Sequence, residues 1–201
     1  MTQSNQMTLQ KGFADPVDGA GQTFRAILDV LSRPGTVAEI AGPAETPHGV
    51  SNTATAVMLT MADYATPVWL DATNTNDAIT SYIRFHTNAT ITSRADQSAF
   101  ALLSGAMPDF SVDAFHPGTP QYPDRSTTLI IDVTGFDSGP MVQLTGPGIN
   151  GKSKFQVNGL PHNFWSEMQI NNALFPLGVD VIFTTPDQLA ALPRSTRIEV
   201  I

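Results

Sequence analysis

The sequence contains no cysteine among its 201 residues. The chain by itself therefore has no thiolate nucleophile, iron–sulfur cluster or cysteine-ligated zinc site, and a cysteine-free composition fits a reducing compartment. No segment approaches the roughly 18 uninterrupted apolar residues of a membrane-spanning helix, and residues 1–11 lack the basic-then-apolar layout of a signal peptide. We therefore expect a cytoplasmic protein without membrane contact.

Basic residues are scarce. The chain has three lysines and seven arginines against 18 acidic residues, which gives a formal net charge of −8. A basic surface for nucleic acid is thus absent, and an acidic surface is also repelled by anionic lipid. With 41% hydrophobic and 14% charged residues, the composition is that of an ordinary globular domain.

Fifteen glycines and fifteen prolines indicate frequent chain reversals and many short elements. The length suits one well-filled core, so we predict a flexible tail over residues 1–11 and a single domain over residues 12–201.

Helical spacing of apolar residues predicts four helices, within residues 18–31, 51–62, 74–88 and 160–175. Asn88 is expected to end the third helix in a left-handed conformation. Strands are predicted at residues 36–40, 66–70, 90–92, 98–103, 126–133, 141–145, 179–184 and 197–201.

Segment 126–133 is the strongest strand, nearly continuous in β-branched and apolar residues, as expected for a central strand buried on both faces. Segment 141–145 is expected to pair with it as a hairpin. Pro67 indicates that strand 66–70 begins there or lies at an edge. The interleaving of helices and strands predicts an α/β fold with a mixed β-sheet flanked by helices.

The densest polar chemistry lies at Arg84 to Asn88, where a guanidinium and an imidazole fall within three residues. Arginine is suited to bidentate phosphate contact, and histidine can donate near neutral pH, so Arg84 and His86 are candidate anion-binding residues. Arg194 is a third candidate. Arg84 and His86 also fall in the last turn of the predicted helix, where cations interact with exposed carbonyls, so a structural role stays open.

Other chemistry finds little support. The four histidines, His48, His86, His116 and His162, lack the spacing of a helical zinc site, and we predict no metal. No nucleophile elbow is present, and the Gly-Pro-Gly at 146–148 is more typical of a turn than of a phosphate-binding loop. The catalytic residues are left unassigned.

Eight short segments carry a family resemblance. They are Phe-Arg (24–25), Ser-Arg-Pro-Gly (32–35), Leu-Thr-Met-Ala-Asp (59–63), Thr-Pro-Val-Trp-Leu (66–70), Arg-Phe-His-Thr-Asn (84–88), Leu-Thr-Gly-Pro-Gly-Ile (144–149), Phe-Pro-Leu-Gly-Val-Asp (175–180) and Leu-Pro-Arg-Ser-Thr (192–196). In this order and spacing the chain, from about residue 12 onward, resembles the PhnH family of the bacterial carbon–phosphorus lyase system.

The resemblance implies membership of the core complex formed with subunits G, I and J in alkylphosphonate catabolism. There the assembly, with an ATPase-like partner, replaces the adenine of ATP by the phosphonate and forms ribose 1-alkylphosphonate 5-triphosphate. The I component looks like the nucleosidase, and no catalytic residues are settled for the PhnH family. The resemblance also implies a homodimer and a fold similar to the large domain of transferases that depend on pyridoxal phosphate (PLP).

A PLP enzyme needs a lysine for the Schiff base. Lys11 lies in the predicted tail, and Lys152 and Lys154 lie near a strand without an aspartate placed to partner the pyridine ring. We therefore predict that the chain uses no cofactor, with the fold kept and its original chemistry lost.

Three functions remain in view. The first is a non-catalytic assembly or helper subunit, because an acidic surface suits docking to partner proteins. The alternative is an enzyme subunit with its own cleft for a phosphate-bearing small molecule, lined by Arg84, His86 and Arg194. A third, less supported, is a free-standing PLP enzyme.

Overall fold

The fold is built on a seven-stranded mixed sheet in the computed structural model, which describes residues 10–201. Five neighbouring strands pair in parallel, and β9 and β1 complete one edge through antiparallel pairings of β9 with β8 and of β1 with β9. In spatial order the strands are β1 (Val37–Glu39), β9 (Gln188–Leu192), β8 (Asp180–Thr184), β5 (Thr128–Asp132), β4 (Phe100–Ser104), β2 (Val68–Leu70) and β3 (Ile91–Thr92). The predicted mixed α/β sheet is confirmed.

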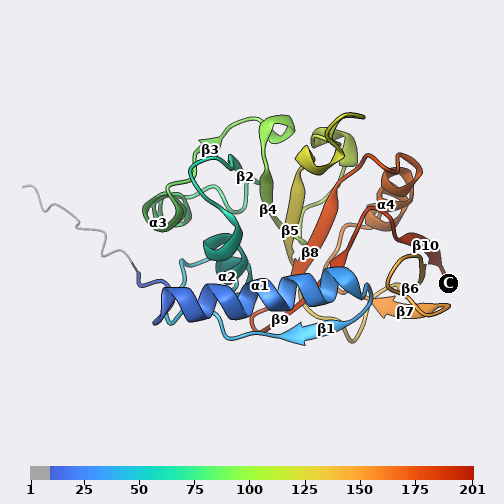
Figure 1. The fold of residues 1–201 in the computed structure, drawn as a ribbon, viewed down its shortest axis with the longest axis horizontal. Coiled ribbons are helices and arrows are strands. Elements are labelled where there is room, and N and C mark those ends of the chain that lie inside the picture. The colour runs from blue at the N-terminus through green and yellow to red at the C-terminus, as the bar shows by residue number, and fades with distance from the viewer. Residues whose placement is uncertain (1–9) are drawn as a thin grey trace, which may run out of the picture.

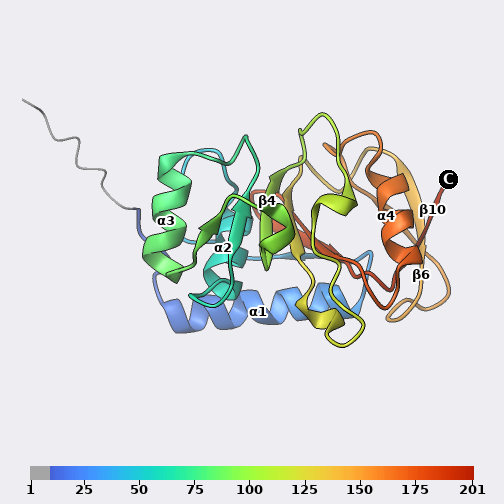
Figure 2. The same cartoon turned by 90° about the horizontal axis from the view of Figure 1, so that it is seen from above.

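Strand β5 is buried on both faces, as predicted. Ile130 faces one hydrophobic cluster with helices α1 (Pro16–Ser32), α2 (Asn52–Met61) and α3 (Asp77–Thr87), while Leu129 and Ile131 face another with helix α4 (Phe164–Ala173). All three side chains are fully buried. Figures 1 and 2 both place α3 and α4 at opposite ends of the molecule.

A second, three-stranded antiparallel sheet lies on the α4 side, with β6 (Met141–Thr145) between β10 (Arg197–Val200) and β7 (Ser153–Gln156). The predicted hairpin of segment 141–145 with segment 126–133 is therefore wrong. The alternation of Val142 and Leu144 identified a strand with one buried face, but alternation does not specify the partner strand. Both side chains pack into the same cluster as β5.

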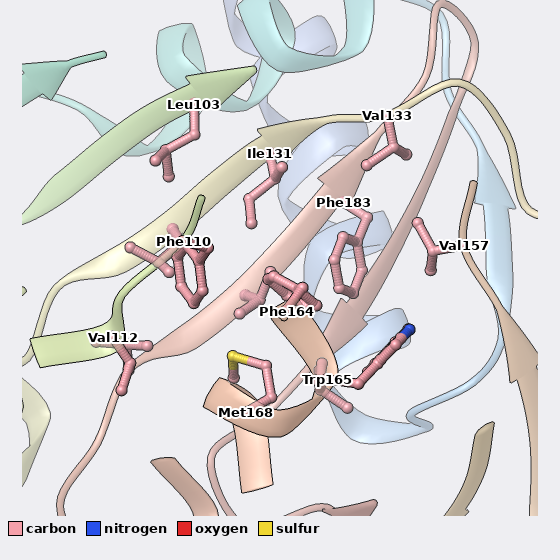
Figure 3. Packing of buried hydrophobic residues seen from close by; sticks show 14 of the residues in the cluster. Leu103, Phe110, Val112, Ile131, Val133, Val157, Phe164, Trp165, Met168 and Phe183 are labelled. Carbon is pink, nitrogen blue, oxygen red and sulfur yellow. The ribbon is translucent and has the colours of Figure 1, made fainter. Parts of the chain in front are cut away.

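The cluster under this small sheet is rich in aromatic rings. Figure 3 shows Phe164, Trp165 and Met168 of α4 beside Phe183 of β8. The rings of Phe164 and Phe183 are 5.7 Å apart at a steep angle, an edge-to-face arrangement favoured by ring quadrupoles. This packing attaches α4 firmly to the central sheet.

Local chemistry at helix ends follows the sequence closely. The Ser51 hydroxyl accepts from the Ala54 amide at the start of α2, and the Asn76 side chain accepts from the Ile79 amide at the start of α3. Asn88 ends α3 with φ of 57°, as predicted. Strand β2 begins directly after Pro67 and lies inside the sheet, so the starting position that the proline indicated is correct and the edge position is wrong.

Strand β9 was missed. Its sequence, Gln-Leu-Ala-Ala-Leu, lacks β-branched residues, so its β propensity is low. Burial between β8 and β1 decides its conformation.

The predicted tail over residues 1–11 lies mostly outside the described residues. Of the two described, the Lys11 amide donates to the Glu45 carboxylate at 3.0 Å, and the Gln10 carbonyl is 2.9 Å from Nε2 of His86. Within residues 10–201, every helix is too short or too polar to cross a bilayer.

The turn after β6 packs against the end of α1, which brings two of the eight family segments together. Gly148 has φ of +78°, and a Cβ there would overlap the Ser32 carbonyl oxygen. Gly151 has nearly the same φ, +74°, with no heavy atom within 4 Å of a Cβ. The two glycines are thus a matched pair that separates backbone strain from steric contact.

We expect Gly151→Ala to lower the free energy of unfolding by about 1 kcal/mol, the cost of a left-handed L-residue. Gly148→Ala should lose roughly 2 kcal/mol more, because the methyl group must displace backbone. Urea denaturation of both variants measures the difference. Equal losses would show that the contact with α1 is unimportant.

Candidate functional site

Arg194, in the turn after β9, donates five hydrogen bonds. Its backbone amide and Nε donate to Oδ1 of Asp180 at 2.8 and 3.1 Å, and its Nη2 lies 2.5 Å from Oδ2. Nη1 donates to the Pro123 carbonyl at 2.5 Å, and Nη2 also donates to the Ser126 hydroxyl at 2.6 Å. The side chain is only 13% exposed.

These bonds join three segments at the amino-terminal ends of the parallel strands. Asp180 opens β8, Ser126 precedes β5, and Arg194 follows β9. An anion at Arg194 would have to replace partners that the guanidinium already has. The geometry therefore gives Arg194 a structural role, and anion binding by this residue remains a prediction.

Arg84 and His86 lie in the last turn of α3, as predicted. Arg84 is exposed, and among the described residues its guanidinium has no hydrogen-bond partner. The centroid of the His86 ring lies 4.4 Å from that of the Tyr82 ring, with the two ring planes tilted by 50°, and Nε2 of His86 is 2.9 Å from the Gln10 carbonyl oxygen. Burial raises the pKa of Tyr82 to about 12, and Glu45 adds to the shift.

The three candidates do not form one site. Asn172, at the end of α4, donates through Nδ2 to the Arg194 carbonyl at 2.8 Å, so Arg194 lies near α4. Arg84 and His86 lie on α3, at the other end of the molecule (Figures 1 and 2). A single phosphate group cannot contact all three.

Two carboxylates that sequence reasoning did not single out lie at the carboxyl ends of the parallel strands. Asp132 ends β5 and accepts from the Ser51 amide at 2.8 Å, the Ser51 hydroxyl at 2.5 Å and the Thr184 hydroxyl at 2.6 Å. Asp71 follows β2 and accepts from the amides of Asn74 and Ser104, both at 2.7 Å. The available signal was an aspartate directly after an apolar strand, at the sheet edge where α/β ligands commonly bind.

Burial raises the pKa of Asp132 above its ordinary value of 3.8. Hydrogen bonds from Ser51 and Thr184 oppose the shift, and the negative charge of Asp71 adds to it. Both carboxylates already bind backbone amides, so they serve to join strands and helix starts. Within residues 10–201, no group of three or more histidine and carboxylate side chains is placed to hold a metal ion.

A cleft of about 500 Å³ lies between the end of α4 and the small sheet. Three of the eight family segments reach it, through Gly146, Phe175 and Ser195. Arg197, the first residue of β10, also lines it. Sequence reasoning did not place a site here, because the segments are about 20 to 30 residues apart in the chain and only the fold brings them together.

The structure thus defines an α/β protein whose described polar clusters mainly join its own elements. The chain matches the model of the family described as bacterial phosphonate metabolism protein (PhnH) over residues 11–199. It belongs to the PhnH family, which confirms the resemblance carried by the eight segments.

Two relatives agree with this assignment. The alpha-D-ribose 1-methylphosphonate 5-triphosphate synthase subunit PhnH of Rhizobium meliloti (strain 1021) is 37% identical over 189 residues, which cover 93% of this chain and 94% of that protein. The putative C-P lyase subunit protein HtxG of Stutzerimonas stutzeri is 39% identical over 83 residues, 41% of this chain and 43% of that protein.

We expect Arg194→Ala to lower the free energy of unfolding by about 3 kcal/mol, because it leaves the carboxylate of Asp180 partly buried without its cation. The matched control is Arg94→Ala. Arg94 pairs with Asp96 at the same 2.5 Å, but the two side chains are 61% and 49% exposed. Chemical denaturation should show little change for the control, since solvent screens that pair. Equal losses would contradict the structural role of Arg194.

We expect Asp132→Asn to lower the free energy of unfolding at neutral pH by about 2 kcal/mol, because an amide cannot accept from all three donors. The folded chain holds the Asp132 proton more tightly than the unfolded chain. Its ionisation therefore lowers stability as pH rises from 3.8 through the raised pKa. The part of the pH dependence of stability that comes from ionisation of Asp132 should disappear in the Asp132→Asn variant.

Denaturation series between pH 3 and 7 measure both effects, with the exposed Asp137→Asn as the control. An unchanged stability at neutral pH, or an unchanged pH slope, would contradict this account of Asp132.

Proposed function

We propose that this chain is a subunit of the synthase complex that forms ribose 1-alkylphosphonate 5-triphosphate from ATP and an alkylphosphonate. It acts there as a non-catalytic assembly or helper subunit. The supporting observation is the match along nearly the whole chain to a relative named as subunit PhnH of alpha-D-ribose 1-methylphosphonate 5-triphosphate synthase. The second relative, named as a putative C-P lyase subunit, supports the same assignment.

The arrangement of polar groups supports a helper role. The Arg194 guanidinium is bound to Asp180, Ser126 and the Pro123 carbonyl, and Asp132 caps the start of α2. These groups stabilise the fold instead of projecting into a common cleft. A catalytic centre needs convergent acid, base or nucleophile groups around one reacting atom.

We propose that the fold is a single domain over residues 12–201, similar to the large domain of PLP-dependent transferases and working without PLP. Lys152 and Lys154 are both exposed, one before and one within β7 of the small sheet. A Schiff-base lysine must sit in a cleft beside groups that hold the phosphate and the ring. These lysines do not fit that requirement, which leaves a free-standing PLP enzyme without support.

The proposed partners are a second copy of the chain and subunits G, I and J, in the cytoplasm. Large apolar side chains exposed near α4 and β10 support protein contacts there, because such surface is costly to leave in water. They are Ile170, Leu174, Val200 and Ile201, each at least 42% exposed.

A second candidate function is an enzyme subunit that contacts a phosphate-bearing small molecule through Arg84 and His86, with Arg194 as a further contact. The favouring observation is the exposed Arg84 guanidinium, which no described residue binds. The opposing observation is the composition of the cleft beside His86, because its other described lining residues have no polar side chain to bind phosphate. They are Gly12, Phe13, Pro16, Ala20 and Leu59.

We expect the full chain to co-purify with subunits G, I and J, and the mixture lacking it to lose conversion of ATP and methylphosphonate. Substituting Arg84 and His86 together by alanine should leave both assembly and conversion intact. Chromatography of the phosphorus-containing products measures conversion, and size-exclusion chromatography measures assembly.

Intact assembly with lost conversion in the double variant would support the phosphate-ligand function instead. A wild-type chain that neither co-purifies nor supports conversion would contradict the complex assignment.

A further inference from the structure

We propose that the cleft between α4 and the small sheet binds one phosphate group of a small ester that also carries a planar ring, such as a nucleoside monophosphate. The site is defined by Arg197, Phe175, Ser195, Thr145, Gly146 and Asn172. The proposal rests on this cleft and not on the assembly role proposed above. A volume of about 500 Å³ falls within the range of small-molecule sites.

Arg197 supplies the charge. It lies on β10 directly opposite Thr145 of β6, and its side chain is exposed. Among residues 10–201 its guanidinium has no hydrogen bond or ion pair, whereas Arg33, Arg94 and Arg194 each pair with an aspartate. An arginine with free donors in a cleft is suited to bidentate contact with phosphate oxygens.

The backbone brings the polar groups close together. Gly146 has φ of +136°, and a Cβ there would lie 3.1 Å from the Ser195 carbonyl oxygen. The absence of a side chain therefore lets the turn after β6 press against the turn before β10. Thr145 and Ser195, whose hydroxyls can donate to an anion, thus lie on the same cleft as Arg197.

Phe175 supplies the surface for a planar ring. It follows the end of α4, its amide donates to the Asn172 carbonyl at 3.1 Å, and the side chain is 60% exposed. A large aromatic side chain exposed on a cleft beside a free arginine can stack on a flat, apolar part of the ligand. Asn172 already donates to the Arg194 carbonyl, which leaves its Oδ1 as an acceptor for a hydroxyl group.

The net charge limits the number of phosphates. With a formal charge of −8, the chain as a whole repels anions, and Arg197 is the cationic side chain that lines this cleft. One guanidinium matches one phosphate, so a monophosphate is the better fit and a triphosphate would leave charge uncompensated.

The test is a titration of the isotope-labelled full chain with AMP, adenosine and inorganic phosphate, followed by nuclear magnetic resonance. We expect AMP to shift the Arg197 Nε–H signal and the amide signals of Gly146 and Ser195. Adenosine, which lacks the phosphate, should shift them far less at the same concentration. Inorganic phosphate should shift Arg197 but bind more weakly than AMP.

Two variants test the two halves of the site. Arg197→Gln should weaken AMP binding by about tenfold or more, because a charge-assisted bidentate contact is lost. Phe175→Ala should lower AMP affinity toward that of phosphate and leave phosphate affinity unchanged. Both residues are exposed, so dispersed spectra should confirm intact folds. The control is Arg84→Gln, an exposed arginine at the opposite end of the molecule, which should bind AMP as the wild type does.

The proposal is overturned if AMP shifts no signal of the cleft, if Arg197→Gln binds AMP as well as the wild type does, or if Arg84→Gln loses as much affinity as Arg197→Gln. These experiments use the isolated chain. Failure of the site is therefore distinguishable from failure of the chain to assemble with its partners.

Discussion

Burial of β5 and β8 on both faces is the constraint on which the other elements depend. Their side chains alternate between two hydrophobic clusters, so each face of the sheet needs its own cover. Helices α1, α2 and α3 cover one face. Helix α4 and the three-stranded sheet cover the other, which explains why β6, β7 and β10 lie outside the main sheet.

Polar groups at the strand ends fix this arrangement. At the carboxyl end, Asp132 binds the start of α2 and the hydroxyl of Thr184. At the amino-terminal end, Asp180 binds Arg194. These buried or half-buried charges are tolerated because each has a hydrogen-bond or ion-pair partner. Removing one partner lowers stability by more than the intact pair contributes to it, because the remaining charge is left buried alone. Asp132, Asp180 and Arg194 therefore serve to position strands and the start of α2.

The eight family segments gain a physical interpretation from these contacts. Gly148 of one segment packs against Ser32 of another, and Arg194 of a third pairs with Asp180 of a fourth. For these four segments, contacts across the fold give a structural reason for the residues that carry the resemblance. Arg197, which has no ion pair among residues 10–201, lies just outside these segments, in a cleft that three of them help to form.

Much of the fold could be predicted from sequence because its determinants are local. Ser51 and Asn88 mark helix ends through their own side chains and backbone preferences, and the apolar run of β5 indicates burial on both faces. Strand β9 was missed because its alanines carry little local preference. The candidate site was harder to predict, because the sequence does not reveal whether an arginine such as Arg194 will be paired with a carboxylate in the folded chain.

The sequence by itself determined the positions of the four helices, the central strand, the left-handed end of α3 and the family, all of which depend on residues near one another or on short segments in order. Only the tertiary structure decided that β6 pairs with β7 and β10, that Arg194 binds Asp180, and that Arg197 and Phe175 share a cleft. Those outcomes depend on pairings between residues that are distant in the chain, and such pairings are set by which faces and charges must be buried together.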